Sequence, residues 1–208
     1  MGQEQAVVYI IDDDESVREG VADLLRSVGH TVCSFRSAQE FLDSDRDDLP
    51  GCIVLDVRLP GPSGLEFQRT LIKSDVLLPV VFVSGHGDIA MSVRAMKFGA
   101  VEFLTKPLHE QQLLDAVQTG IERDRTRRRQ AKAVGELQQR FHSLTPRERE
   151  IFTLIVAGRR NKQIAADLDL SEMTVKVHRS QITRKMAASS VVDLVRMADK
   201  LGISTERS

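Results

Sequence analysis

The sequence has 208 residues, of which 41% are hydrophobic and 28% charged, which is typical of a soluble globular protein with room for two modest domains. No apolar run approaches the ~18 residues of a membrane-spanning helix, and the N-terminus lacks the features of a secretory signal. We therefore expect a cytoplasmic protein with no membrane partner. Two cysteines, Cys33 and Cys52, are too few for a disulfide framework or a metal knuckle, so we expect both to be small buried residues.

The net charge of −1 hides an uneven distribution along the chain. Residues 1–120 carry 10 basic and 19 acidic side chains, a balance of −9, whereas residues 121–208 carry 19 basic and 11 acidic ones, a balance of +8. This polarity favours cations as ligands of the first half and polyanions as ligands of the second. A merely solvated basic face would give the same imbalance, so charge alone does not decide.

The first half alternates short apolar runs with amphipathic segments. The runs are rich in Val, Ile or Phe, end in turn residues, and predict strands at residues 7–11, 31–35, 52–56, 80–84 and 101–105. Between them, apolar residues recur at helix spacing, as in residues 17–25 and 89–97. Continuous apolar strands that alternate with helices predict a parallel sheet covered on both faces.

After about Ile121 the strand signals stop and the remaining pattern is helical. The charge run 123–129 predicts a long exposed helix whose charged middle has no core to face. Thr145, Pro146 and Glu148 then form a complete helix start, with a capping Thr, Pro at the first helical position and Glu closing a capping box. Residues 161–168 and 172–186 predict two further helices separated by a short turn.

Carboxylates follow two of the predicted strands. Asp12, Asp13 and Asp14 come directly after the first strand, and Asp56 ends the third. The carboxyl ends of parallel strands form a common crevice, where close carboxylates repel unless a cation or a proton joins them. Mg²⁺, with Mn²⁺ as an alternative, suits such oxygen donors. A competing explanation is that Asp13 or Asp14 merely caps the helix that begins near residue 15.

Ser84 ends the fourth strand and Lys106 follows the fifth, so a hydroxyl and a cation join the carboxylates at the same rim. A carboxylate nucleophile can form an aspartyl-phosphate, and phosphoryl transfer then needs mainly positioning and charge neutralisation. Two other phosphate sites fit less well. A dinucleotide fold with its glycine motif at 85–90 requires an acidic residue at the position of Lys106. A haloacid-dehalogenase-type phosphatase requires a second Asp at the position of Arg58.

Four segments, IIDDDESV, VLDVRLPGPSGLEF, VVFVSGHGD and GAVEFLTKP, resemble the receiver domain of two-component response regulators over about residues 5–122. The resemblance implies a flavodoxin-like α/β fold, with a parallel five-stranded sheet of order 2-1-3-4-5. It also implies a phosphoacceptor, Asp56, and a Mg²⁺ site formed by Asp12, Asp13, Asp56 and the backbone carbonyl of Arg58. Further roles implied are the switch hydroxyl Ser84, the phosphate-pairing Lys106 before a cis Pro107, and the switch aromatic Phe103.

The second half contains a candidate DNA-reading helix at residues 172–186, with Ser171 as its N-cap. The positions that recur at helix spacing and are expected to face the core are Val175, His178, Ile182 and Met186. The opposite face suits the major groove of DNA. The residues expected to approach bases are Met173, Thr174, Lys176, Val177, Ser180 and Arg184, and those expected to meet phosphates are Lys162, Arg179 and Lys185. An ordinary helical hairpin with a solvated face remains the alternative.

The segment LTPREREIFTLIVAGRRNKQIAADLDLSEMTVKVHRSQITRKM is similar to the four-helix, helix-turn-helix LuxR-type output domain over about residues 142–202. Joined to a receiver, it resembles the FixJ/NarL class of response regulators. That implies a receiver at 1–122, a helical linker at 123–141 and a DNA-binding domain at 142–208. The class implies a transcription factor, not an enzyme beyond slow self-dephosphorylation. Its implied partners are a cognate sensor histidine kinase, operator DNA, RNA polymerase and, when phosphorylated, a second copy.

Overall fold

The computed structural model describes residues 5–85 and 89–203. The chain divides into two compact units, residues 1–128 and 129–208, and one long helix, α5 (Glu110–His142), continues across the division. No helix within the described ranges is long and apolar enough to cross a membrane.

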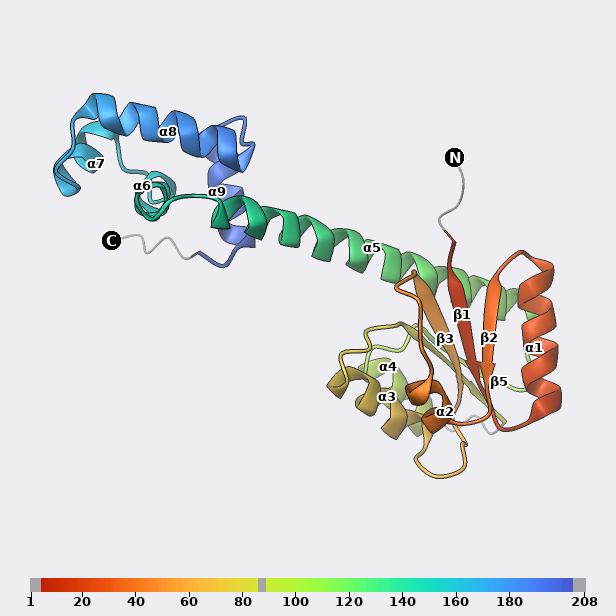
Figure 1. The fold of residues 1–208 in the computed structure, drawn as a ribbon. Coiled ribbons are helices and arrows are strands. Elements are labelled where there is room, and N and C mark those ends of the chain that lie inside the picture. The colour runs from red at the N-terminus through yellow and green to blue at the C-terminus, as the bar shows by residue number, and fades with distance from the viewer. Residues whose placement is uncertain (1–4, 86–88, 204–208) are drawn as a thin grey trace. The chain divides into compact units, whose positions relative to one another are not determined.

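The first unit is built on a parallel five-stranded sheet with the order β2-β1-β3-β4-β5, which confirms the predicted topology. Figure 1 shows β2, β1 and β3 side by side in this sheet. The strands are β1 (Val7–Ile11), β2 (Thr31–Phe35), β3 (Gly51–Asp56), β4 (Val80–Ser84) and β5 (Glu102–Thr105). The central strands β1, β3 and β4 are buried along their whole length. Their runs of Val, Ile and Leu are therefore explained by helices on both faces of the sheet.

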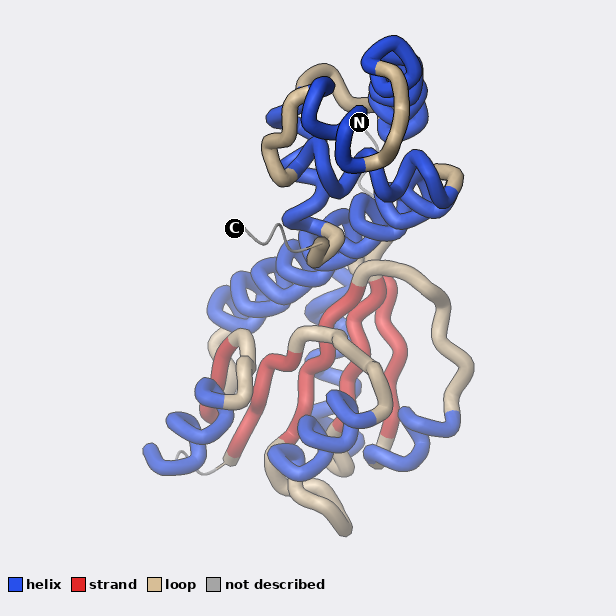
Figure 2. Tube along the Cα trace, turned by 90° about the vertical axis from the view of Figure 1, so that its left-hand side faces the viewer, coloured by secondary structure: helices blue, strands red, loops and turns tan. Residues whose placement is uncertain are grey.

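Alternate residues of each strand pack into two separate cores. Tyr9, Leu55 and Phe82 face α2 (Ala38–Asp43), α3 (Gly64–Lys73) and α4 (Ile89–Lys97). Val8, Val54 and Val81 face α1 (Glu15–Ser27) and the first part of α5. Figure 2 shows these helices on either side of the strands. The two cores hold the carboxyl ends of the strands in fixed register at one edge of the sheet.

Two sequence-based expectations are wrong in this unit. Cys52 is buried, and its burial raises the pKa of its thiol to about 12, but Cys33 is exposed because β2 is an edge strand. The charged stretch of α5 does face a core, since Asp124 is completely buried. Its Oδ2 accepts a hydrogen bond from the backbone N–H of Gly51 at 3.0 Å, at the start of β3. The linker helix is therefore anchored to the sheet by a carboxylate.

Over its described residues, 129–203, the second unit consists of the end of α5 and four further helices: α6 (Pro146–Val156), α7 (Asn161–Asp167), α8 (Glu172–Met186) and α9 (Val191–Lys200). All of them contribute to one core, in which the fully buried side chains include Phe152, Ile164, Val175 and Ile182. Thr145 caps α6, Pro146 begins it, and Glu148 closes the capping box, as predicted.

Candidate functional site

The chemical groups predicted to form one site do meet at the carboxyl edge of the sheet. Asp12 follows β1, Asp56 ends β3, Ser84 ends β4 and Lys106 follows β5. The residues Asp12, Asp56 and Ser84 are almost entirely buried, at 4%, 5% and 0% exposure. Buried carboxylates need a cationic partner, and the structure supplies one from a different strand.

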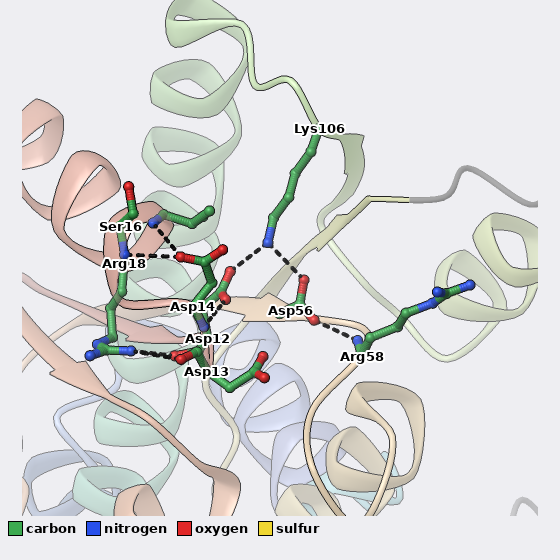
Figure 3. Close-up of polar contacts among 9 residues, drawn as sticks. Asp12, Asp13, Asp14, Ser16, Arg18, Asp56, Arg58 and Lys106 are labelled. Carbon is green, nitrogen blue, oxygen red and sulfur yellow. Dashed lines mark hydrogen bonds and ion pairs between the residues drawn. The ribbon is translucent and has the colours of Figure 1, made fainter.

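Lys106 joins the two buried carboxylates. Its Nζ lies 2.8 Å from Oδ2 of Asp12 and 3.1 Å from Oδ1 of Asp56 (Figure 3). The Lys106 backbone N–H donates to the carbonyl of Ser84 at 2.8 Å, and the Lys106–Pro107 peptide bond is cis, as the resemblance implied. Burial alone would lower the pKa of Lys106, but the hydrogen bonds and charges of Asp12 and Asp56 outweigh burial and raise it. The lysine is therefore held as a cation between two acids.

Burial destabilises the ionised form of the Asp12 carboxyl. Burial raises the pKa of this carboxyl, although hydrogen bonds from Lys106 and from the backbone N–H of Asp14 work in the opposite direction. The Asp14 N–H donates to Oδ1 of Asp12 at 3.0 Å. Positive charge beyond that of Lys106 would therefore stabilise the ionised form of Asp12.

The two neighbouring acids differ in role. Asp14 caps α1, because its Oδ1 accepts hydrogen bonds from the backbone of Ser16 at 2.9 Å and Val17 at 3.2 Å. The capping alternative is thus right for Asp14. Asp13 is exposed, and its carboxylate lies apart from Lys106 in Figure 3. Its predicted role as a metal ligand stays a prediction.

Arg58 belongs to the site through its backbone. The Arg58 N–H donates to Oδ2 of Asp56 at 2.6 Å, while its side chain points away from the carboxylates (Figure 3). Both oxygens of Asp56 therefore have a fixed donor, Lys106 on one and the backbone on the other. This fixes the orientation of the carboxyl group at the edge of the sheet.

The donor chemistry of the site fits a hard divalent cation. Within residues 5–85 and 89–203, no group of three or more His, Cys, Asp or Glu side chains is arranged to hold a metal ion. Mg²⁺, however, is commonly bound by only one or two carboxylates and keeps several waters. Asp12 and Asp56 are two buried oxygen donors already paired with one cation, so the donor set is compatible with Mg²⁺.

Ser84 and Phe103, the two predicted switch residues, lie at the end of β4 and within β5, and their switch roles stay predictions. Ser84 is completely buried beside Lys106, to whose backbone it is hydrogen-bonded. The Phe103 ring is partly buried against Phe82, with ring centroids 6.4 Å apart, so it also serves the core. Residues 86–88, part of the glycine-containing segment that the sequence disfavours as a dinucleotide site, lie outside the described residues.

Gly64 is a site residue that the sequence interpretation did not identify. It begins α3, which Ser63 and Glu66 cap through a reciprocal pair of hydrogen bonds. A Cβ at position 64 would lie 2.5 Å from the carbonyl oxygen of Asp56 and 3.1 Å from Cα of Val57. Only glycine lets the start of α3 come this close to the strand that carries Asp56. In the sequence alone, a glycine several residues beyond Asp56 gives no local signal of that approach.

In the second unit, α7 and α8 form the predicted helix-turn-helix. Ser171 caps α8, with its Oγ accepting from the backbone N–H of Thr174 at 3.0 Å. Val175, Ile182 and Met186 are fully buried, as predicted, whereas His178 is only half-buried. The residues of the predicted base-reading face that are exposed are Met173, Lys176, Val177, Ser180 and Arg184.

The predicted base-reading face of α8 includes exposed apolar side chains. Met173 is 68% exposed and Val177 50%, although both lie on a helix with a well-formed core face. Lys162 is exposed and Arg179 half-buried. These positions are compatible with contacts to DNA, and the contacts themselves stay predictions.

Lys185 has a structural role that the sequence did not reveal. Its Nζ lies 2.6 Å from Oε2 of Glu148, which is only 2% exposed, and 3.4 Å from the carbonyl of Ser143. The same Glu148 oxygen accepts from the Thr145 N–H at 2.7 Å. Because its ammonium joins α8 to the start of α6, Lys185 is not among the DNA contacts that we propose below.

The Glu148 network predicts acid sensitivity in the second unit. Burial alone would raise the pKa of Glu148, but hydrogen bonds from Lys185 and Thr145 and the charge of Lys185 lower it. A lowered folded-state pKa gives a contribution that is present above about pH 4.5 and is lost as the pH falls through the folded value. We expect Glu148→Gln to be less stable than the wild type at pH 7 and to approach it at pH 3. Denaturant unfolding at both pH values measures this, with the exposed Glu150→Gln as control, and an unchanged gap would contradict it.

Both halves of the chain match known protein families. The family of response regulator receiver domains matches residues 8–118, and the luxR family of bacterial regulatory proteins matches residues 142–198. The chain therefore belongs to the response regulators that join a receiver domain to a LuxR-type DNA-binding domain. These are transcriptional regulators rather than enzymes.

Several response regulators are similar to the chain over almost its whole length. Nodulation protein W of Bradyrhizobium diazoefficiens is 48% identical over 98% of this chain and 90% of its own length. The transcriptional regulatory protein FixJ of Azorhizobium caulinodans is 42% identical over 97% of this chain and 95% of its own length. The solved structure of response regulator StyR is 46% identical, with a TM-score of 0.84 over 94% of this chain and 99% of that one. The resemblance to FixJ is thus confirmed.

Proposed function

We propose that phosphorylation of Asp56 by a cognate sensor histidine kinase switches this regulator to a form that dimerises and binds operator DNA. One observation carries the proposal: the buried acids Asp12 and Asp56 are joined by Lys106 at the carboxyl edge of the sheet, over 2.8 and 3.1 Å. Transfer of a phosphoryl group to a carboxylate requires mainly positioning and charge neutralisation, and this arrangement offers both.

The transfer itself needs no other group of the protein to react. An oxygen of Asp56 attacks the phosphorus of a phosphohistidine, the new O–P bond forms as the P–N bond breaks, and the electron pair stays on the imidazole nitrogen. Lys106 then pairs with a phosphoryl oxygen, and the hydroxyl of Ser84 donates to another. Mg²⁺ or Mn²⁺ would add positive charge; its proposed ligands are Asp12, Asp13, Asp56 and the carbonyl of Arg58.

A groove beside Lys106 supports docking of the kinase next to the acceptor. Its volume is about 290 Å³, and it lies between α1 and the start of α5. Apolar side chains dominate its lining, among them Val17, Leu24 and Leu108. An apolar surface at the rim of the site suits a protein donor better than a small charged one.

The exposed face of α4 supports dimerisation of the receiver. Ile89, Val93 and Met96 recur at helix spacing and are 81%, 46% and 45% exposed. A single helix that presents three large apolar side chains is a candidate interface. We propose that the phosphoryl group draws in Ser84, that Phe103 follows, and that this stabilises the α4 face in its dimerising form.

In the second unit we propose that α8 enters the major groove and reads bases. The proposed base-reading residues are Met173, Thr174, Lys176, Val177, Ser180 and Arg184, and Lys162 and Arg179 meet phosphates. Two such helices in a dimer would read two half-sites. Because the ligand is genomic DNA, we place the protein in the bacterial cytoplasm, with RNA polymerase as its further partner.

The domain limits are part of the proposal. We propose a receiver at 1–122, a linker at 123–141 and a DNA-binding domain at 142–208, in keeping with the family matches at 8–118 and 142–198. The burial of Asp124 supports one change to these limits: the first turn of the proposed linker packs as part of the receiver.

Replacing Asp56 with Asn tests the switch. Asn keeps the shape of the side chain but cannot form the acyl phosphate, so acetyl phosphate should dimerise the wild type and leave D56N monomeric. Sedimentation velocity with Mg²⁺ measures the two states. Asp75→Asn, a change at an exposed carboxylate of the same unit, is the matched control and should respond like the wild type. Dimers of D56N formed at the wild-type concentration of acetyl phosphate would contradict the proposal.

A further inference from the structure

An arginine of α1 holds the acidic turn between β1 and α1. Arg18 lies near the start of that helix, and its side chain runs back toward the turn (Figure 3). Its Nη1 donates to the carbonyl oxygen of Asp12 at 2.8 Å and reaches the carbonyl oxygen of Asp13 at 3.5 Å. One guanidinium thus contacts the backbone of both acids proposed to face the cation.

The choice of acceptor atoms is informative. Arg18 contacts the carbonyl oxygens of Asp12 and Asp13, whereas Lys106 takes a carboxylate oxygen of Asp12. A cationic side chain that binds the carboxylate oxygens competes with a metal ion for the same atoms. A cationic side chain that binds the backbone carbonyls leaves the carboxylate oxygens free to bind the metal. It still fixes the backbone that carries the two carboxylates.

The rest of the turn is fixed by local hydrogen bonds. The Asp14 N–H donates to the Asp12 carboxylate, and the Asp14 carboxylate caps α1. These bonds orient the first and third acids, but they do not involve the backbone carbonyl of Asp13. The contact from Arg18 reaches that carbonyl from α1, a helix packed firmly on the sheet through Val21 and Leu25.

We propose that Arg18 is a positioning residue for the divalent-cation site, acting through the backbone of residues 12 and 13. The proposal rests on the proposed function, since it takes Asp12 and Asp13 as ligands. Removal of a group that orients metal ligands typically costs about 10- to 100-fold in metal affinity. The opposing effect is repulsion between the guanidinium and the metal ion, which would make the affinity rise on removal. Loss of positioning would therefore lower the metal affinity of an Arg18 variant, whereas loss of repulsion would raise it.

The test compares Arg18→Met, Arg18→Lys and the matched control Arg26→Met in the full-length chain. Arg26 lies on the same helix, and its Nη1 contacts the exposed Asp23 at 3.3 Å. Mn²⁺ binding is followed by loss of the electron paramagnetic resonance signal of the free ion, and Mg²⁺ by competition. We expect affinity to fall about 10- to 100-fold in R18M, less in R18K, and to stay unchanged in R26M.

A second readout separates positioning from simple loss of stability. Acetyl-phosphate labelling of R18M should need more Mg²⁺ than the wild type but should reach the wild-type rate at saturation. Equal or tighter Mn²⁺ binding by R18M, or a lower rate at saturating Mg²⁺ with unchanged Mn²⁺ affinity, would overturn the role of Arg18. Wild-type protein that binds Mn²⁺ yet never becomes labelled at Asp56 would instead overturn the proposed function and leave the positioning role standing.

Discussion

Replacing Asp124 with Ala should lower the free energy of unfolding of the receiver by about 2–4 kcal/mol. The Asp124 carboxylate is completely buried. Its Oδ1 accepts from Arg127 at 2.6 and 3.0 Å, and its Oδ2 accepts from Arg128 at 2.8 Å and from the Gly51 N–H at 3.0 Å. The substitution leaves a buried N–H without its acceptor and two arginines without their shared anion. The higher helix propensity of Ala offsets only about 0.5 kcal/mol of this loss.

Asp48→Ala is the matched control for that substitution. Asp48 also pairs with Arg128, but its side chain is 96% exposed. Because exposed ion pairs contribute little, we expect a far smaller change than for D124A. Urea unfolding monitored by circular dichroism compares the two variants. Equal effects of both would show that Arg128, and not the buried anchor on β3, determines the stability.

Replacing Lys106 with Met should lower the stability of the receiver by about 1–3 kcal/mol when no divalent cation is present. Asp12 and Asp56 would remain buried without the ammonium that now lies between them. The pKa of Lys106 is raised, so its contribution is fully present at neutral pH and is lost only as the pH rises through its alkaline folded value. The full effect of the substitution is therefore expected at pH 7.

Mg²⁺ should restore more stability to K106M than it adds to the wild type, because binding to the folded state stabilises it and the freed carboxylates have no competing cation. Thermal unfolding at pH 7, with and without Mg²⁺, measures the difference. Lys73→Met, at an exposed lysine of α3, serves as control and should behave like the wild type. An equal Mg²⁺ effect in K106M and wild type would argue against a cation site at these carboxylates.

Much of the receiver follows from local pattern. The strands and the helices between them are recognised from the spacing of apolar residues in contiguous sequence. The bounds of the predicted strands agree with those in the structure to within about a residue. Asp12, Asp56 and Lys106 can be grouped from the sequence alone, because parallel strands end at one edge of their sheet. In the second unit, the capping residues Thr145 and Ser171 mark helix starts for a similarly local reason.

The features that escaped prediction depend on contacts between distant segments. Asp124 resembles one charge among many in a charged run, and the backbone N–H that its buried carboxylate accepts from belongs to Gly51, 73 positions away. Lys185 has the sequence position of a phosphate contact, but Glu148, 37 positions away, holds its ammonium. Gly64 and Arg18 act on backbone atoms, which carry no residue-specific signal.

The central claim is that the phosphorylated state of Asp56 controls DNA binding. The most direct measurement is footprinting of the full-length protein on genomic DNA with and without beryllofluoride, an acyl-phosphate mimic, for wild type and D56N. We predict that beryllofluoride lowers the wild-type concentration needed for protection of paired half-sites and has no effect on D56N. Protection by the wild type that is independent of beryllofluoride, or equal enhancement in D56N, would contradict it.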